Sequence, residues 1–349
     1  MDSRKVIIAA GGTGGHLFPA ISLAHQLEQR GDAVLFVGGN LSNNPFFDQT
    51  RFAFREISCA RPTFKSPAFP LGIAKGTWQS LRIFKEFNPN FLVGFGSYYT
   101  FPSLIAAKMM KIPYVIHEQN SVPGRVNRLF TQSACFTAVH FPSVIEKIKG
   151  NCHIVEMPLR PGFNTQWEKE EAKQAYGLSP SLPVILVFGG SQGAEAINQL
   201  LFDSARGLKR FQVLHFTGTE HWNIRLKERY REVGLKAVVK PFEEEMAKAW
   251  GAADLVISRA GAASIAEQLE MGVPGILIPY PYATDGHQDA NADYLVSMEG
   301  AVKVPQHLLN PETFSEIVDS IYSNLDHMRD ALIEQKKEKL RLIDCLEVL

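Results

Sequence analysis

Residues 6–27 read VIIAAGGTGGHLFPAISLAHQL and predict a strand, a glycine-rich turn and a helix in succession. The five apolar residues before the glycines are typical of a buried parallel strand, and the apolar spacing after them is typical of a helix. Residues 184–204 read VILVFGGSQGAEAINQLLFDS and repeat this arrangement. In each copy Gly-Gly is followed by a hydroxyl residue, Thr13 or Ser191, then by one variable residue and another glycine. The repeat predicts an α/β protein with two doubly wound Rossmann-like domains facing a cleft.

The length and composition agree with two globular domains. The chain has 349 residues, of which 45% are hydrophobic and 21% are charged; these values exclude a disordered chain, a fibrous repeat and a disulfide scaffold. We place the boundary in the proline-containing stretch near residues 157–162. This gives a first domain of residues 1–157 and a second of residues 158–331. The final stretch, about residues 315–349, has a helical and charged pattern.

The charges are unevenly distributed, although they cancel over the whole chain. Residues 1–157 contain 16 basic and 9 acidic side chains, whereas the remaining 192 residues contain 20 and 27. The positive excess indicates that the first half faces an anionic partner. The sequence has no leader-like start and no stretch of about 18 apolar residues, so we expect a cytosolic protein that can still bind a membrane surface. Its four cysteines form no C-x-x-C pair and predict neither disulfide bridges nor a metal site.

The two glycine loops predict phosphate binding. Glycines let the backbone approach a ligand closely, and the helix that follows presents unpaired N–H groups at its positive end. Residues 11–16 lack the last glycine of a dinucleotide fingerprint, and no lysine follows to complete a nucleoside-triphosphate loop. The pattern therefore disfavours an NAD enzyme and a standard NTPase. A purely structural turn stays open as an alternative.

The second loop also fits a different chemistry. Residues 189–193 match the G-x-S-x-G elbow of serine hydrolases, which places a nucleophile, here Ser191, between a strand and a helix. The other members of a triad would come from Asp254, Asp285, His287, His307 and His327. The first loop carries Thr13 in place of the serine, however, and a hydrolase has no use for such a copy.

A third element lies further along the chain. Residues 258–267 read SRAGAASIAE and are predicted to follow a strand and open another helix, so backbone N–H groups again point at a ligand. Within that helix, the carboxylate of Glu267 can bind a vicinal diol such as ribose. Residues 287–292, HQDANA, add Gln and Asn amides, which both donate and accept hydrogen bonds and so suit sugar hydroxyls. The alternatives are a solvated charge at Glu267 and an exposed loop residue at Gln288.

Five motifs together resemble those of one family. They are GGTGGH at 11–16, HEQN at 117–120, GGSQGA at 189–194, RAGAASIAE at 259–267 and HQDANA at 287–292. In this order they are similar to the MurG family of peptidoglycan glycosyltransferases, which moves N-acetylglucosamine from UDP-GlcNAc onto lipid I to form lipid II. The motifs span nearly the whole chain, and HEQN beside GGTGGH is highly specific to the family.

The resemblance implies a GT-B fold with an acceptor domain first and a UDP-sugar domain second. It also implies a C-terminal helix, about residues 332–349, that returns to the first domain. UDP-GlcNAc and lipid I are the implied substrates, and nucleic acid is not expected. By motif match, the expected UDP-GlcNAc contacts are Thr13, Gly14, Gly15, Asn120, Arg160, Ser191, Phe242, Glu243, Ala262, Ala263, Ser264, Ile265, Ala266, Glu267 and Gln288.

The implied reaction is an inverting transfer to the 4-hydroxyl of the muramyl sugar. The helix N-termini after Gly193 and Ala262, together with Arg160, would neutralise the leaving diphosphate. Because the chain has no Asp-x-Asp sugar-nucleotide motif, we expect no metal and no cofactor. A base must accept the hydroxyl proton. His16 is the first candidate and Glu118 the second, although His16 can instead serve only to shape its loop.

Residues 71–87, LGIAKGTWQSLRIFKEF, predict a helix with an apolar stripe. The stripe contains Leu71, Ala74, Trp78 and Leu81, with Phe84 extending it. An apolar strip with a tryptophan and basic borders suits the surface of an anionic membrane, although a helix packed on its own sheet fits the same pattern. The resemblance favours the membrane and implies a peripheral protein at the cytoplasmic face of the cell membrane. The expected membrane contacts are Leu71, Lys75, Trp78, Leu81, Arg82 and Lys85.

Other functions stay open on the sequence alone. A different UDP-sugar transferase or a UDP-GlcNAc epimerase would keep the motifs of the second half, but would not need HEQN beside a basic apolar strip. A nucleotide-sensing module would bind the UDP-sugar and turn nothing over.

Overall fold

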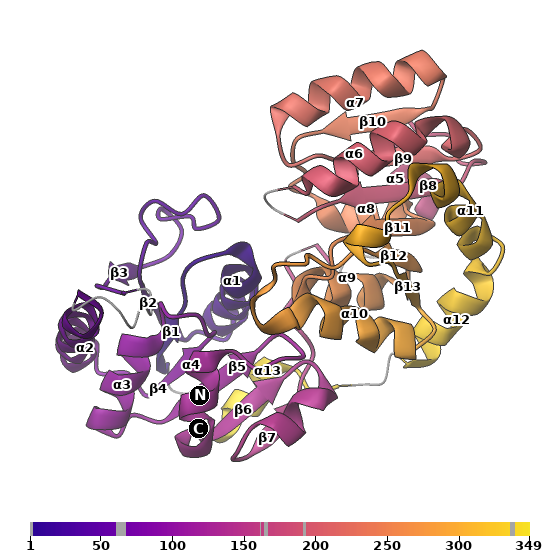
Figure 1. Cartoon of the computed structure of the whole chain (residues 1–349). Coiled ribbons are helices and arrows are strands. Elements are labelled where there is room, and N and C mark those ends of the chain that lie inside the picture. The colour runs from indigo at the N-terminus through magenta and orange to yellow at the C-terminus, as the bar shows by residue number, and fades with distance from the viewer. Residues whose placement is uncertain (1–2, 61–67, 161, 164–166, 191–192, 336–338) are drawn as a thin grey trace. The chain divides into compact units, whose positions relative to one another are not determined.

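The computed structural model describes residues 3–60, 68–160, 162–163, 167–190, 193–335 and 339–349. The chain divides into two compact units. Unit 1 is Met1–Arg160 with Lys339–Leu349, and unit 2 is Pro161–Glu338 (Figure 1). Each unit contains one parallel sheet with helices on its faces, which confirms the predicted α/β fold. Among the helices of the described ranges, none has the length and apolarity needed to cross a membrane.

Unit 1 is built on a seven-stranded sheet with the strand order β3-β2-β1-β4-β5-β6-β7. Its strands are β1 (Lys5–Ala9), β2 (Ala33–Gly38), β3 (Phe54–Glu56), β4 (Phe91–Gly94), β5 (Tyr114–Glu118), β6 (Phe136–Val139) and β7 (Cys152–Ile154). Its helices are α1 (Gly14–Gln29), α2 (Ala68–Phe87), α3 (Phe101–Met110), α4 (Arg125–Phe130) and α13 (Leu342–Cys345). Because the strand pairs are parallel, the connecting segments must cross back over a face of the sheet.

Both faces of this sheet are buried. Strand β1 alternates along its length, with Val6 and Ile8 packed in the cluster that includes α1 and α13. Ile7 and Ala9 point the other way, into the cluster that includes side chains of α2, α3 and α4. This explains why β1 reads as a continuous apolar run rather than as alternating apolar and polar residues.

The C-terminal segment differs from the single helix expected over about residues 332–349. Helix α12 (Leu325–Gln335) ends within unit 2, and Leu340 instead forms a parallel bridge with Val155, next to β7. The amide of Glu156 donates to the carbonyl oxygen of Leu340 (2.9 Å), which requires extended chain there. The segment then packs on α1, where Arg30 forms ion pairs with Asp344 (2.6 Å) and with Glu347 (2.8 Å).

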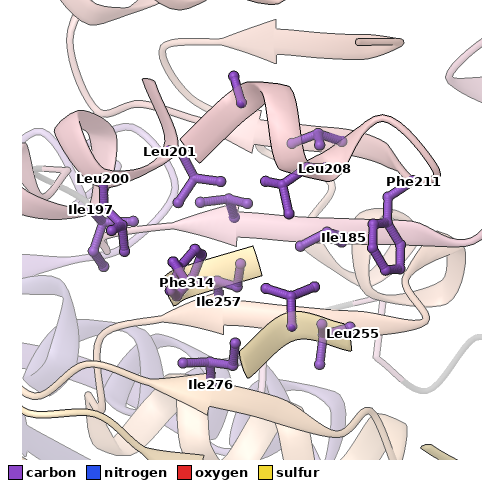
Figure 2. Close-up of a cluster of buried hydrophobic side chains, with 14 of the residues drawn as sticks. Ile185, Ile197, Leu200, Leu201, Leu208, Phe211, Leu255, Ile257, Ile276 and Phe314 are labelled. Carbon is purple, nitrogen blue, oxygen red and sulfur yellow. The ribbon is translucent and has the colours of Figure 1, made fainter. Parts of the chain in front are cut away.

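Unit 2 is built on a six-stranded sheet with the order β10-β9-β8-β11-β12-β13. Its strands are β8 (Val184–Phe188), β9 (Gln212–Phe216), β10 (Ala237–Lys240), β11 (Leu255–Ser258), β12 (Gly275–Leu277) and β13 (Ala301–Lys303). Its helices are α5 (Lys169–Ala175), α6 (Glu195–Ser204), α7 (Glu220–Val233), α8 (Met246–Ala252), α9 (Ala262–Met271), α10 (His287–Ser297), α11 (Pro311–Tyr322) and α12. Figure 2 shows part of the core, where Leu201 and Phe314 from two helices pack with Ile185 and Ile257 from the sheet.

The strand order reverses at β1 in unit 1 and at β8 in unit 2. Strand β1 lies between β2 and β4, and β8 lies between β9 and β11. In doubly wound sheets, ligands bind outside the carboxyl ends of the strands at such a reversal. Both glycine loops leave their sheets there, so the fold places the two predicted phosphate-binding elements at equivalent positions.

Two buried glutamines of unit 2 provide a test of how the core is stabilised. Gln268 on α9 is fully buried, and neither its oxygen nor its nitrogen has a hydrogen-bond partner among the described residues. Gln212 on β9 is equally buried, but its Oε1 accepts from the amide of Ser179 (2.7 Å) and its Nε2 donates to two carbonyl oxygens.

We predict that Gln268→Met raises the free energy of unfolding of unit 2 by about 1 kcal/mol. The change replaces a buried amide, unpaired among the described residues, by an apolar side chain of similar volume. The melting temperature should rise by about 2–4 °C in calorimetry. The matched control, Gln212→Met, should lower it, since three satisfied hydrogen bonds are lost. A lower melting temperature for Gln268→Met would show that this amide is paired in solution.

Candidate functional site

The first glycine loop joins β1 to α1 at the carboxyl edge of the unit 1 sheet. Gly12 has φ +89°, a backbone conformation that favours glycine, so the turn depends on this residue. Thr13 is the N-cap of α1, and its carbonyl oxygen accepts a hydrogen bond from the amide of His16 (3.1 Å). Gly14 and Gly15 begin the helix, so their amides have no intrahelical acceptor and lie at its positive end. Backbone donors therefore lie where the sequence predicts them.

His16 is half-buried in the first turn of α1, with its Nδ1 3.4 Å from the hydroxyl oxygen of Thr13. His117, in β5, is close enough to interact with it electrostatically. His117 is fully buried, and neither of its ring nitrogens has a partner in the described part of the chain. Burial, and secondly the charge of His16, lower the pKa of His117 to about 3. His117 is therefore neutral.

Glu118, the last residue of β5, is buried and engaged in hydrogen bonds. Its Oε1 accepts from the amide of Asn120 (3.0 Å), and its Oε2 accepts from the amide of Gly124 (2.8 Å) and from Nδ2 of Asn127 (2.8 Å). Burial raises the pKa of Glu118, and these hydrogen bonds oppose that shift. The second base candidate thus lies inside the unit with its oxygens occupied.

Two further side chains connect the HEQN segment and the domain boundary to α1. Gln119 is buried, and its Nε2 donates to the carbonyl oxygens of Phe95 (3.2 Å) and Gly15 (3.5 Å). The guanidinium carbon of Arg160 lies 4.9 Å from the centre of the Phe18 ring on α1. The expected site residues of unit 1 that gather near the first turns of α1 and the end of β5 are Thr13, Gly14, Gly15, His16, Glu118, Asn120 and Arg160.

The second glycine loop joins β8 to α6 in the same way. Gly190 and Gly193 have φ of +90° and +71°, and a Cβ on Gly193 would collide with the carbonyl oxygen of Thr217. The expected contact Ser191 lies outside the described residues. Helix α6 begins two residues after Gly193, so its free amides lie just beyond the loop.

A buried polar network fixes the first turns of α6 to the sheet. Asn198 donates from Nδ2 to the carbonyl oxygen of Thr217 (3.0 Å), and its Oδ1 lies 2.9 Å from Nε2 of His215. The other ring nitrogen of His215 lies 2.8 Å from the hydroxyl of Tyr230. Burial lowers the pKa of His215 to about 3, so the neutral ring donates to Asn198 and accepts from Tyr230. The network holds the glycine loop against β9.

The third element opens α9 after β11, with Gly261 as its N-cap. Ala263 and Ser264 are partly exposed in the first turn, whereas Ala262, Ile265 and Ala266 are buried. Glu267 is 4% exposed, and its Oε2 accepts a hydrogen bond from Nε1 of Trp250 (2.9 Å). Burial excludes the solvated helix charge at Glu267 that the sequence left open.

Polar side chains also fix the segments around α9. Arg259 is buried and donates to the carbonyl oxygens of Ile278 and Pro279, both at 3.1 Å. Gln288, at the start of α10, accepts from the amide of Tyr280 (2.9 Å) through Oε1, so it is not a free loop residue. Asn291 donates to the carbonyl oxygen of Ala260 (3.1 Å) just before α9. Side-chain hydrogen bonds therefore fix the backbone at the carboxyl ends of β11 and β12.

Two of the expected UDP-GlcNAc contacts, Phe242 and Glu243, follow β10, the edge strand of the same sheet. Phe242 is exposed, while Glu243 is buried and accepts from Nζ of Lys240 (2.8 Å) and from the amide of Glu245 (3.0 Å). These bonds lower the pKa of Glu243 despite its burial. A fixed carboxylate thus lies next in sequence to an exposed aromatic ring.

The hydrolase interpretation loses one of its triad members. Asp254 precedes β11 and accepts from the amide of Val184, at the start of β8 (2.9 Å). It also forms ion pairs with Lys169 (2.8 Å) and Lys173 (2.9 Å). The glycine loop leaves the opposite end of β8, so Asp254 lies at the other edge of the sheet from this loop.

Helix α2 confirms the helix predicted over residues 71–87, but not all of its apolar stripe is exposed. Leu71 and Trp78 are 71% and 60% exposed, and Arg82 lies over the Trp78 ring at 5.8 Å. Leu81 is half-buried against the core, and Phe84 is fully buried. The predicted extension of the stripe to Phe84 is wrong, because this ring lies on the face of α2 that packs on the sheet.

Neighbouring helices add exposed apolar and basic side chains to the same side of unit 1. Helices α2, α3 and α4 all contribute to the cluster on this face of the sheet, so we call their outer surface the α2–α4 face. Its exposed large apolar residues are Leu71, Trp78, Met109, Met110 and Leu129. Its exposed basic residues are Lys75, Arg82, Lys85, Lys108, Lys111, Arg125 and Arg128. Glu86 is the exposed carboxylate among residues 68–130, since Glu118 is buried.

The sequence did not assign a role to Gln119 within HEQN, and it did not reveal Trp250 or the network of Asn198, His215 and Tyr230. Asn198 lies in the helix after a predicted phosphate loop, which was a usable signal. The other partners come from strands and helices whose contacts no spacing rule specifies. Within the described ranges, no group of three or more His, Cys, Asp or Glu side chains could hold a metal ion.

Comparison with known proteins shows the family of this chain. Residues 6–140 match the glycosyltransferase family 28 N-terminal domain, and residues 184–344 match the C-terminal domain of the same family. A relative from Protochlamydia amoebophila is 44% identical over 99% of this chain and 96% of its own length. A relative from Chlamydia pneumoniae is 36% identical over 90% and 88%. Both are named UDP-N-acetylglucosamine--N-acetylmuramyl-(pentapeptide) pyrophosphoryl-undecaprenol N-acetylglucosamine transferase.

Solved structures agree with these relatives. MurG of Acinetobacter baumannii superposes with a TM-score of 0.80 at 26% identity, over 99% of this chain and 100% of that one. Os79 from Oryza sativa has a TM-score of 0.70 at 12% identity over 94% of both chains, which reflects the shared fold alone. The fold is the GT-B fold expected from the sequence. The chain belongs to glycosyltransferase family 28.

Proposed function

We propose that this chain transfers N-acetylglucosamine from UDP-GlcNAc to the 4-hydroxyl of the muramyl sugar of lipid I, with inversion, to form lipid II for peptidoglycan synthesis. The observation that carries the proposal is the 44% identity, over almost the full length of both chains, to a relative named for transfer of N-acetylglucosamine to this acceptor. The geometry of both units agrees with it, since the loops expected to hold substrates lie at the carboxyl edges of their sheets.

Donor binding is assigned to unit 2. The amides at the starts of α6 and α9 supply partial positive charge for the diphosphate without a basic side chain. Glu267, held by Trp250, is assigned to the ribose diol, and the amide nitrogen of Gln288 to a sugar hydroxyl, because its oxygen already accepts from Tyr280. Phe242 offers an exposed ring for the uracil. Ser191 belongs to the same proposal through its motif.

Unit 1 supplies the base. We assign it to His16, since His117 is fully buried with a pKa lowered to about 3, which makes it a weak base, and the oxygens of Glu118 accept internal hydrogen bonds. Neutral His16 takes the proton of the 4-hydroxyl as this oxygen attacks the anomeric carbon and UDP leaves. Of the remaining unit 1 residues expected at the donor, Gly14 and Gly15 offer amides, and Thr13, Asn120 and Arg160 offer polar side chains.

Radiolabelled GlcNAc should pass from UDP-GlcNAc to a short-chain lipid I analogue, and EDTA should not reduce the rate, because backbone dipoles neutralise the leaving group. UDP-glucose and UDP-N-acetylgalactosamine are the matched donors and should give much less product. If UDP-GlcNAc binds and no labelled lipid forms, the acceptor assignment fails. If another UDP-sugar is the better donor, the donor assignment fails.

His16→Ala should lower kcat by about 10²–10⁴-fold, the usual contribution of a general base, and change the KM for UDP-GlcNAc much less. Steady-state kinetics with both substrates measures this. His25→Ala is the control on the same helix, because His25 packs on Phe52 away from the glycine loop. Near wild-type turnover of His16→Ala with unchanged donor affinity would reduce His16 to a residue that shapes the loop.

The lipid acceptor requires contact with a bilayer, and we propose that the α2–α4 face supplies it at the cytoplasmic face of the cell membrane. Exposed Leu71, Trp78 and Leu129 lie among basic side chains on this face. An amphipathic aromatic ring suits the headgroup level, and each basic residue near an anionic surface adds about 1 kcal/mol of attraction. The near absence of exposed carboxylates favours the same partner.

In vesicle flotation, the pair Trp78→Ser with Lys75→Glu should reduce binding to phosphatidylglycerol vesicles by at least tenfold, and added salt should weaken wild-type binding. The matched control is Ile224→Ser with Lys227→Glu, an exposed apolar–lysine pair of the same spacing on α7 of unit 2. Equal flotation of both double variants would remove the α2–α4 face from the proposal.

A further inference from the structure

The loop between β5 and α4 is held by a single buried carboxylate. Residues 119–124 connect the two elements, and Glu118 immediately precedes them. Its backbone is fixed by the register of β5 with β6, in which it pairs with Val139. Its side chain is 2% exposed and turns back toward the loop that follows. The carboxylate therefore lies beneath the loop rather than on it.

Four donors converge on this carboxylate. They are the amide of Asn120 (3.0 Å), the side chain of Asn120, the amide of Gly124 (2.8 Å) and Nδ2 of Asn127 (2.8 Å). They come from the start of the loop, from its last residue and from the first turn of α4. An ionised carboxylate offers about four acceptor sites, so these donors fill it. A neutral amide in its place could not accept from all of them.

From this geometry we infer that Glu118 is a positioning residue, which fixes the loop of residues 119–124 and holds Asn120, by its backbone amide and its side chain, in the position from which it contacts the UDP-GlcNAc donor. The inference rests on the proposed function for the identity of that donor. It assigns Glu118 no part in proton transfer, because a base must reach the hydroxyl that it deprotonates. The raised pKa of a buried carboxyl would suit a base as well, so the hydrogen bonds carry the distinction.

Gly124 shows why a side chain is needed at this place. It is the N-cap of α4 and has no side chain that could accept from the helix amides. Glu118 instead accepts a hydrogen bond from the amide of Gly124. The glutamate of a capping box accepts a hydrogen bond from the N-cap amide in the same way. The carboxylate thus fixes both ends of the loop that carries Asn120.

The test compares Glu118→Gln with Asn127→Ala, which removes one donor and leaves the carboxylate intact. We expect each variant to weaken UDP-GlcNAc binding in calorimetry by at least tenfold, to raise KM for UDP-GlcNAc similarly, and to lower kcat less. The double variant should bind UDP-GlcNAc with the same affinity as whichever single variant binds it less tightly, because both changes release the same loop. The acid limb of log kcat against pH should keep its apparent pKa. Glu146→Gln, an exposed carboxylate of unit 1, should change nothing.

The inference is overturned if Glu118→Gln lowers kcat or abolishes the acid limb while donor affinity is unchanged, or if Asn127→Ala binds UDP-GlcNAc as wild type does. If Glu118→Gln does not fold, the donor affinity of Asn127→Ala decides alone, a tenfold loss supporting the inference and wild-type affinity overturning it. Calorimetry needs no acceptor, so wild-type protein that binds UDP-GlcNAc but forms no labelled lipid would refute the acceptor assignment while the two dissociation constants still decide the role of Glu118.

Discussion

The parallel pairing of β1 with β2 and β4, repeated by β8 with β9 and β11, determines where ligands can meet this chain. The carboxyl ends of parallel strands lie at the same edge of a sheet. Where the loop that leaves such an end leads directly into a helix, the free amides of that helix lie near this edge. Packing at this edge is tight, since a Cβ on Gly38 would overlap the carbonyl oxygen of Ala10. Glycine-rich turns are thus a steric requirement of the edge as well as a means of binding phosphate.

Buried polar side chains complete these edges, because loops that leave a sheet lose the hydrogen bonds of the ladder. Glu118 serves the loop after β5, Asn198 and His215 serve the start of α6, and Arg259 serves the segment after β12. Each is surrounded by matching donors or acceptors, which offsets the free energy of removing it from water. His117 is the contrast: it is buried and neutral, and its ring nitrogens have no hydrogen-bond partner among the residues that the structure describes.

The sequence predicted most of what local pattern controls. The strand–glycine–helix repeat predicts both sheets, and the helix over residues 71–87 lies within α2. It failed where tertiary contacts decide. Phe84 fits the apolar stripe by spacing, yet its side chain lies on the face of α2 that packs in the core. Leu340 is extended rather than helical, because it pairs with Val155 in a parallel bridge. The role of Glu118 is different, since the motif HEQN is compatible with a base and with a positioning residue, and nothing in the motif shows that Gly124 and Asn127 face the carboxylate.

The uneven charge of the chain gains a physical reason from the two sites. Residues 1–157 hold 16 basic and 9 acidic side chains, which suits a surface proposed for anionic lipid. The rest holds 20 and 27, although its proposed ligand is a doubly charged diphosphate. Helix N-termini resolve this, because their partial charges act within about one turn, whereas side-chain charges act over a Debye length of about 8 Å. A donor site built from backbone amides can therefore bind a diphosphate although it lies in the acidic half of the chain. The net negative charge of this half disfavours its binding to an anionic membrane.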